Sequence, residues 1–259
     1  MINLLRANLY YIKKSIFFWV ILTITFFLSI YIFFNNYFPN CVDCPNQLGA
    51  SFFGFNTLNH FIGPIAICLF IGALYSEGAI RNRITIGHSR TNIYLANLIT
   101  SITISLIYIL IYIITISIIG LIFQEGIGLT VSQMLILLFD SFLLCVALSS
   151  IFTFLSMLVA NKTISIIFFI AFILLSLELE ISLAEKLSLL DSTSLSYKIY
   201  EFFYHLLPMN QASSLFSAPL RIVESSGMEE YNFLWIYSLI LSVVLTIIGI
   251  LLFKKKNIR

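Results

Sequence analysis

Long apolar runs separated by short polar segments dominate this chain. A helix that crosses a bilayer needs about 20 mainly apolar residues. Six segments are typical of such helices: residues 16–38, 54–75, 95–123, 133–159, 163–179 and 232–253. The pattern therefore predicts an all-α membrane protein whose six transmembrane helices form a single domain over residues 1–259.

The first 15 residues predict a further helix, lying in the membrane interface. Polar side chains recur at helical spacing on one face and apolar side chains on the other, with Asn8 intruding on the apolar face. The polar set is Asn3, Arg6, Tyr10, Lys13 and Lys14, and the apolar set is Leu5, Leu9, Ile12 and Ile16. The alternative is a plain positive flank that only orients the first span.

The segment between the fifth and sixth spans, residues 180–231, is longer than most connections in compact proteins. An amphipathic helix is predicted within it, packed on the outer mouth of the bundle and ending before Pro208. Its apolar stripe is Leu195, Ile199, Phe202, Phe203 and Leu206, and a shorter helix is indicated by Leu183, Leu187 and Leu190. The alternative is a lid that does no more than cover apolar surface.

Composition supports the membrane interpretation, and charge orients the chain. Hydrophobic residues make up 60% of the 259 positions and charged residues 10%, against about 25% charged in soluble domains. Lys and Arg concentrate on the cytoplasmic side of membrane proteins, so an even number of spans places both termini there. That side then receives Arg6, Lys13, Lys14, Arg81, Arg83, Arg90, Lys162, Lys254, Lys255, Lys256 and Arg259. Richness in Ile, Asn, Phe and Lys indicates an AT-rich genome, typical of a low-GC bacterium, so the membrane is expected to be a bacterial cell membrane. We expect no nucleic-acid partner.

The cytoplasmic segment 77–90 carries most of the charge between the second and third spans. Glu77 and Arg81 stand four residues apart, the favourable order for a pair on one helix. Gly87 can end that helix, and Ser89 can cap the next one. The sequence thus predicts a short helix lying across the membrane surface, which is either a docking element or an ordinary positively charged loop.

Catalytic and metal-binding motifs are absent from the sequence. It contains no G-x-x-x-x-G-K-[ST], H-E-x-x-H or G-x-S-x-G, so neither P-loop ATP binding nor the corresponding hydrolases are indicated. His60, His88 and His205 lie far apart, and we interpret them as polar surface or interface residues. No metal site is predicted.

The cysteines fall into two groups. Cys41 and Cys44, in the first outer loop, form a C-x-x-C that is compatible with a disulfide or with free thiols. Cys68 and Cys145 lie within spans and are interpreted as packing residues.

Asp140 lies within the fourth span, where a charged side chain is costly. We therefore expect it to avoid lipid and to accept a hydrogen bond from Tyr112 or Tyr108 of the third span. The alternative is that Asp140 lines a transport path.

Together, the N-terminal interfacial helix, the six spans and the acidic-then-basic segment resemble the membrane subunit of ABC-2-type exporters. Glu77, Gly78 and Arg90 match the family pattern between spans two and three. Two further stretches are similar to the family, "HLLPMNQA" at 205–212 and "LFKKKNIR" at 252–259. The resemblance implies a coupling helix that docks on a separate ATPase, with the coupling residues Glu77, Arg81, Arg83, Gly87 and Arg90.

The same resemblance implies a transport subunit that is not itself an enzyme. Two ATPase chains would bind ATP and Mg, this chain would hold no cofactor, and a second permease chain, identical or different, would complete the transporter in the bilayer. Its small bacterial members suggest export of antimicrobial or phenol-soluble-modulin-type peptides.

The expected translocation path lies on spans one, two and five and is aromatic: Phe26, Phe27, Phe61, Phe168 and Phe172. Lipid-facing packing explains any single Phe equally well. The other functions left open are export of lipids or drugs, ion-coupled transport, and a membrane scaffold or intramembrane enzyme that binds a cytoplasmic partner through 77–90.

Overall fold

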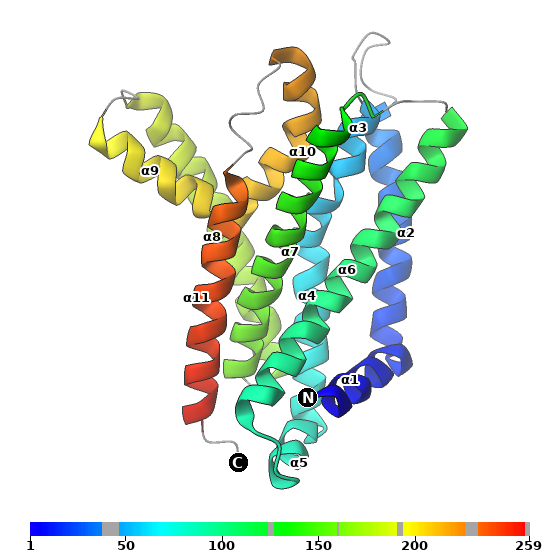
Figure 1. Ribbon diagram of the computed structural model, residues 1–259, viewed down its shortest axis with the longest axis vertical. Coiled ribbons are helices and arrows are strands. Elements are labelled where there is room, and N and C mark those ends of the chain that lie inside the picture. Colours follow the sequence, from blue (N-terminus) through cyan, green and yellow to red (C-terminus); the bar gives the residue numbers. More distant parts are fainter. Residues whose placement is uncertain (38–46, 124–126, 160, 191–193, 226–232, 257–259) are drawn as a thin grey trace.

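The protein is a bundle of long α-helices (Figure 1). The computed structural model describes residues 1–37, 47–123, 127–159, 161–190, 194–225 and 233–256. Within these ranges every regular element is an α-helix. The elements are α1 (Ile2–Lys14), α2 (Ile16–Tyr37), α3 (Gln47–Phe53), α4 (Phe55–Ser76), α5 (Ala79–Thr85), α6 (Arg90–Phe123), α7 (Val131–Val159), α8 (Lys162–Leu189), α9 (Leu195–Leu206), α10 (Pro208–Ser225) and α11 (Leu234–Lys255).

Six helices in the described residues are long and apolar enough to cross a membrane: α2, α3 continued by α4, α6, α7, α8 and α11. The prediction of an all-α membrane protein with six spans is therefore confirmed. One boundary was wrong, because α8 continues to Leu189 instead of ending near Glu178. Glutamate is a good helix former, so charge ends the apolar stretch without ending the helix. The shorter helix expected around Leu183 is consequently the last part of α8.

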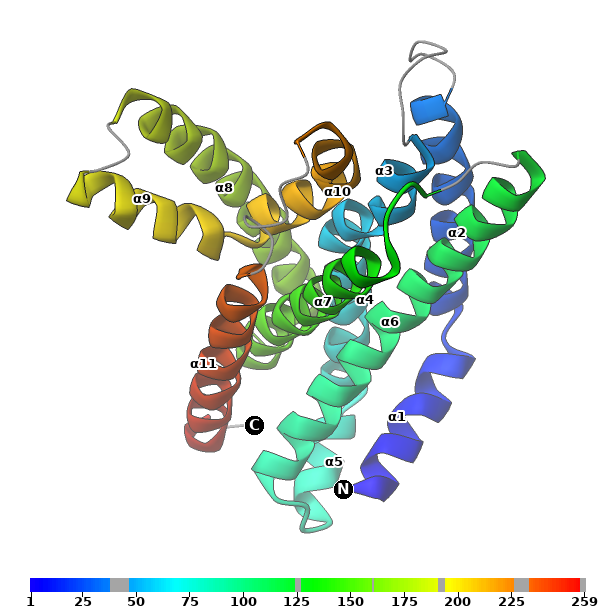
Figure 2. The same cartoon turned by 45° about the horizontal axis from the view of Figure 1, so that its top comes forward.

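The core of the bundle lies around α4 and α7. In the most apolar 18-residue stretches of α3–α4 and of α7, 67% and 61% of the residues are buried, whereas the corresponding share is 17% in α2 and 17% in α8. Small residues allow this close packing: a Cβ on Gly72 of α4 would lie 2.7 Å from the Cα of Lys162. Since α2, α6, α8 and α11 surround this core, their outward faces remain apolar and exposed (Figures 1 and 2).

The two ends of the bundle differ in charge. α1, α5 and the last turn of α11 lie at the same end (Figure 1). We name it the basic end, because these elements carry Arg6, Lys13, Lys14, Arg81, Arg83, Lys254 and Lys255. α9 and α10 lie at the opposite end.

At the opposite end, α10 occupies the mouth of the bundle and buries Ala212, Leu215 and Ala218. Pro208 is the first residue of α10, a favoured position because its missing N–H would have no helical partner. Gln211 accepts a hydrogen bond from Ser238 of α11.

α9 has the predicted boundaries and is capped by Ser194, whose hydroxyl accepts from the amide of Tyr197. The expected packing by Phe202 and Phe203 is only partial: their side chains remain 44% and 52% exposed. Phe202 contacts the ring of Tyr237 of α11, and Phe203 lines a groove with Leu241 and Leu245 of the same helix. The reason is that α9 pairs with the C-terminal part of α8, and this helical hairpin leans away from the other helices (Figure 2).

Candidate functional site at the basic end

The short helix α5 is set between two glycines in the left-handed region. Gly78 has φ 69° and Gly87 has φ 100°, conformations that side chains other than glycine adopt at a cost. At Gly87 the chain forms a Schellman motif. His88 N–H bonds to the carbonyl of Arg83 at 3.1 Å, and Gly87 N–H bonds to that of Ile84 at 3.0 Å. The turn between α5 and α6 therefore has a defined geometry.

The next helix starts as the sequence predicted. Ser89 Oγ accepts from the amide of Asn92 at 3.3 Å, and α6 begins at Arg90. Local capping signals thus position both α5 and the entry into α6.

Glu77 does not pair with Arg81 along one helix, so that expectation was wrong. Glu77 is the C-cap of α4, Arg81 belongs to α5, and the chain turns at Gly78 between them. The carboxylate of Glu77 instead accepts a hydrogen bond from Tyr11 Oη of α1 at 2.6 Å. Burial, and then the hydrogen bond and negative charge of Glu77, raise the pKa of Tyr11 to about 12. Tyr11 is therefore a protonated donor at neutral pH.

Arg83 points into the protein. Its Nη2 donates to Asn8 Oδ1 at 2.7 Å and its Nη1 to Asn97 Oδ1 at 3.5 Å. Asn8 Nδ2 in turn donates to Asn97 Oδ1 and to Thr100 Oγ1, both at 3.0 Å. Burial lowers the pKa of the Arg83 guanidinium, which nevertheless remains a cation at neutral pH. One polar network thus joins α1, α5 and α6.

Asn8, which interrupts the apolar face predicted from the sequence, belongs to the buried face of α1. Its side chain is completely buried, and with Leu4 and Ile12 it forms the face of α1 that packs inward, whereas Leu9 is exposed. A buried amide is stable when its groups are hydrogen-bonded, and Asn97, Thr100 and Arg83 supply those partners. α1 is consequently attached to the bundle and not only amphipathic.

Arg90 and Lys256 hold the end of α11. Arg90 Nη1 donates to the carbonyls of Phe253, Lys254 and Lys256. Such capping by a cation is favourable at a helix C-terminus. Arg90 therefore has an internal contact that the sequence did not reveal.

Lys256, which follows α11, contacts the end of α7. Its Nζ donates to the carbonyls of Met157 at 2.8 Å and Leu158 at 2.6 Å and lies 4.8 Å from the centre of the Tyr75 ring. Burial lowers the pKa of Lys256 to about 8. The ends of α4, α7 and α11 are thereby joined.

The five predicted coupling residues consequently have different environments. Arg83 and Arg90 have internal hydrogen bonds, Glu77 is bonded to α1, and Gly87 shapes the turn. Arg81 is exposed. With it, Asn82, Thr85 and Ile86 form an exposed face of α5 and its C-cap, and Ile86 is 77% exposed.

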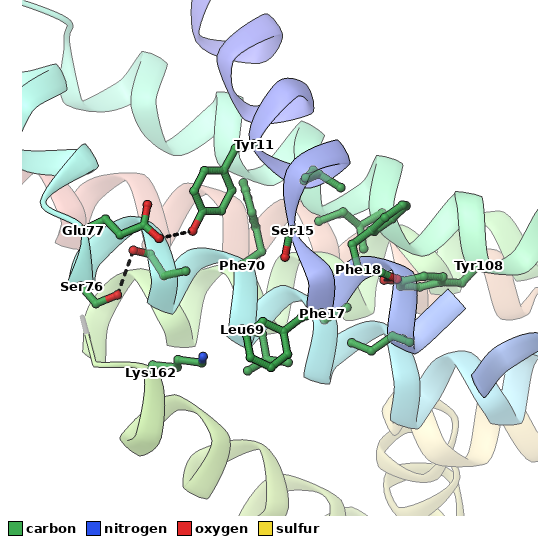
Figure 3. Close-up of a pocket in the computed structure, with 15 residues that line it drawn as sticks. Tyr11, Ser15, Phe17, Phe18, Leu69, Phe70, Ser76, Glu77, Tyr108 and Lys162 are labelled. Atoms are coloured by element: carbon green, nitrogen blue, oxygen red, sulfur yellow. Dashed lines mark hydrogen bonds between the residues drawn. The ribbon is translucent and has the colours of Figure 1, made fainter. Parts of the chain in front are cut away.

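A cavity of about 160 Å³ lies next to this segment. It is bounded by α1, α2, α4, α6 and the first residue of α8 (Figure 3). Glu77 and Lys162 lie at one end of it, and Phe18 and Tyr108 lie at the other (Figure 3).

The intramembrane polar residues are buried, but in different contacts from those expected. Asp140 is 2% exposed and so avoids lipid as predicted. The predicted hydrogen bond from a tyrosine was wrong: Tyr112 Oη donates to the carbonyl of Ser51 at 2.7 Å and Tyr108 Oη to that of Phe18 at 3.5 Å. The tyrosines face α3 and α2. Asp140 instead faces the backbone amide of Trp235, although among the described residues neither carboxylate oxygen has a hydrogen bond of normal geometry.

His60 was also misassigned as a polar surface or interface residue. Its side chain is fully buried, beside the rings of Phe61 and Phe172. In the described part of the chain, neither ring nitrogen has a hydrogen-bond partner.

The residues of the expected translocation path do not form a common surface in a single chain. Phe26, Phe27 and Phe168 are exposed on α2 and α8, whereas Phe61 and Phe172 are half-buried. Cys68 and Cys145 are buried free thiols, which confirms their assignment to packing, and Cys41 and Cys44 lie outside the described residues. No cluster of three or more His, Cys, Asp or Glu able to hold a metal occurs among the residues described.

The fold defines an all-α multi-pass membrane protein. No protein-family model matches the sequence, and no curated protein is significantly similar to it.

Proposed function

We propose that this chain is the membrane-spanning permease subunit of an ATP-driven exporter of the ABC-2 type. The proposal rests on the environment of α5, a short helix between two spans. The outer face of α5 is exposed, whereas Arg83 on its inner face is hydrogen-bonded to α1 and α6. A helix held in this way can transmit a displacement to the spans. The resemblance of 77–90 to the coupling helix of that family supports the same conclusion.

The basic end faces the cytoplasm in this proposal, because Lys and Arg accumulate on that side of a membrane. The membrane is the bacterial cell membrane, and the partner is an ATPase, two copies per transporter, that binds ATP and Mg. It would contact Arg81, Asn82, Thr85 and Ile86, the exposed positions of the segment. Closure of the ATPase pair would then move α5 as a unit.

Three internal contacts would pass that movement on. Arg83 connects α5 with α1 and α6, the Tyr11–Glu77 hydrogen bond connects α1 with the end of α4, and Arg90 connects α6 with α11. The exposed apolar faces of α2 and α8, which include Phe26, Phe27 and Phe168, would meet a second permease chain. An aromatic seam of this kind suits amphipathic peptides as cargo.

The test is an ATPase-coupling experiment with substitutions on the exposed face of α5. The tagged chain is purified from its native membranes, and co-purifying P-loop ATPase and its cargo-stimulated ATP hydrolysis are measured. We expect the double variant Arg81→Glu/Ile86→Asp to lose both the co-purifying ATPase and the cargo-stimulated ATP hydrolysis, while the amount of the chain in the membrane stays normal. Lys198→Glu, on α9 at the opposite end, is the matched control and should change neither.

Retention of a stoichiometric, stimulated ATPase in the Arg81→Glu/Ile86→Asp double variant would reject α5 as the coupling element. Export that continues in cells lacking the ATPase would reject ATP-driven transport altogether. Arg83 is unsuitable for this test, because its substitution disturbs the internal network.

A further inference from the structure

The cavity between α1, α2, α4, α6 and α8 has a polar end and an apolar end. Tyr11, Ser15, Ser76, Glu77 and Lys162 supply its polar groups. The apolar wall consists of Ile12, Phe17, Phe18, Ile21, Ala66, Leu69, Phe70, Ala73, Ile104 and Tyr108. Figure 3 shows Ser76, Glu77 and Lys162 toward one end of the space and Phe18 and Tyr108 toward the other, with Ser15, Phe17, Leu69 and Phe70 between them. A molecule that extends along the space meets charged groups at one end and aromatic side chains at the other, so an amphiphilic molecule fits it best.

The backbone is arranged so that Lys162 reaches this cavity. Asn161 caps α8, with Oδ1 accepting from the amides of Thr163 at 2.9 Å and Ile164 at 3.4 Å. The start of α8 then packs directly on Gly72 of α4, where any Cβ would collide with Lys162. Lys162 is thus fixed as the first residue of its helix, beside the end of α4 that carries Glu77.

The two charged groups in the cavity do not neutralise each other. The ammonium of Lys162 lies over the Phe17 ring, 4.3 Å from its centre, and among the described residues it has no carboxylate partner. Within the described ranges, the carboxylate of Glu77 accepts a hydrogen bond from the uncharged Tyr11 hydroxyl and has no cationic partner. One cavity therefore offers a cation and an anion to the same ligand.

We infer that this cavity binds the headgroup and the adjoining acyl chain of a phospholipid whose headgroup carries both a phosphate and a primary ammonium. The phosphate meets Lys162, and the ammonium donates to Glu77, whose second oxygen is free of the Tyr11 bond. The acyl chain follows the apolar wall toward Phe18 and Tyr108. A cation and an anion together match a zwitterion better than a purely anionic headgroup.

The source of the ligand is the leaflet at the basic end. The cavity lies where α1 joins α2 and where α4 and α8 have their ends at that face, so its apolar part is at the depth of acyl chains. Bound lipid would touch Glu77 and Tyr11 and so stabilise the junction of α1 with α4. Lipid binding in this cavity does not require any protein to dock on α5.

The experiment titrates the purified full-length chain, in detergent micelles, with dihexanoyl phosphatidylethanolamine and counts bound lipid by native mass spectrometry. Three probes accompany it: the phosphatidylcholine of the same chain length, which lacks N–H donors, the phosphatidylglycerol, which lacks the cation, and glycerophosphoethanolamine, which lacks the acyl chains. We expect phosphatidylethanolamine to bind most tightly.

Two substitutions identify the groups responsible. Lys162→Gln should weaken all three phospholipids by roughly ten-fold, the scale of one lost charge-assisted hydrogen bond. Glu77→Gln keeps the bond to Tyr11 and should abolish the preference for phosphatidylethanolamine over phosphatidylcholine. Lys186→Gln, at the opposite end near Tyr200, is the control and should leave binding unchanged; thermal unfolding verifies that all three variants fold.

The inference is overturned if phosphatidylglycerol binds best, or if neither Lys162→Gln nor Glu77→Gln alters binding. Equal affinity for glycerophosphoethanolamine would also overturn it, because the ligand would then be a soluble headgroup and not a lipid. ATPase coupling is not measured in this experiment, so its failure is independent of the proposed function.

Discussion

Arg83 Nη2 donates a hydrogen bond of 2.7 Å to Asn8 Oδ1, although 75 residues separate them in the sequence. The contact fastens the only positively charged side chain in the last turn of α5 to the buried face of α1. It continues through Asn97 and Thr100 into α6. Any force applied to α5 is therefore shared by α1 and by the third span.

The first prediction tests how much this network stabilises the fold. Asn8→Ala leaves the polar groups of Arg83, Asn97 and Thr100 without their partner in a buried site. A buried group that loses its hydrogen bond costs about 1–3 kcal/mol, so the free energy of unfolding should fall by that amount. Asn3→Ala, an exposed position on the same helix, is the control and should have little effect in thermal unfolding of the detergent-purified protein. Equal stabilities would show that α1 is only loosely attached.

The second prediction concerns the clamp of Arg90 on α11. Arg90→Gln cannot bridge the carbonyls of Phe253, Lys254 and Lys256 that the guanidinium reaches. Amide hydrogen exchange in the last turn of α11 should become faster, with the rest of that helix unchanged. Arg81→Gln removes an exposed guanidinium of the neighbouring helix α5 and should leave exchange in α11 as it is. Unchanged protection in the Arg90 variant would mean that the C-terminal turn is held by Lys256 alone.

Much of the fold was predictable because it follows local rules. The six spans follow from runs of apolar residues, and the end of α5 and the start of α6 follow from Gly87 and Ser89, whose effects reach only three to five residues along the chain. The contacts of Asn8, Arg90 and Lys256 depend on which helix faces which. Those pairings arise from tertiary packing, so periodicity does not encode them. The same reason explains why Asp140 was paired with the wrong helix.

The third prediction is a pH dependence of stability that originates at Lys256. Its pKa is lowered from 10.5 to about 8 in the folded state, so between these values the unfolded state binds more protons. Stability must then rise with pH across that window; the contribution is complete above about 10.5 and is lost as the pH falls through about 8. A neutral amine still has N–H groups for the carbonyls of Met157 and Leu158.

Lys256→Met removes this titration. The difference in unfolding free energy between the wild type and Lys256→Met should shift in favour of the wild type as the pH rises from 8 to 10.5. Lys254→Met, whose ammonium lies on the exposed side of the same turn, should follow the wild-type curve. A pH-independent difference for Lys256→Met would contradict the lowered pKa.

The fourth prediction addresses the turn at Gly87. A Cβ there would meet no atom within 4 Å, so Gly87→Ala disturbs only the backbone. Its φ of 100° is unfavourable for alanine, and the cost is about 1–2 kcal/mol. We expect a modest loss of stability and a larger loss of partner-stimulated ATP hydrolysis, because the Schellman turn sets the angle between α5 and α6. Ser196→Ala, exposed on α9 at the opposite end of the bundle, should preserve both; a normal ATPase response in Gly87→Ala would remove the turn from the coupling pathway.

The fifth prediction separates a structural from a transport role for Asp140. Its carboxylate is buried and faces the backbone amide of Trp235 in the first turn of α11, where a helix carries free N–H groups and partial positive charge. Asp140→Asn keeps an acceptor there and removes a buried charge, so the variant should fold and export normally. Asp140→Leu has similar volume but no acceptor, and the free energy of unfolding should fall by about 1–3 kcal/mol. Unfolding of both variants and export from cells are the measurements. An Asp140→Asn protein that is as stable as the wild type but exports nothing would show that the charge acts on the cargo, because that substitution keeps an acceptor oxygen and removes only the charge.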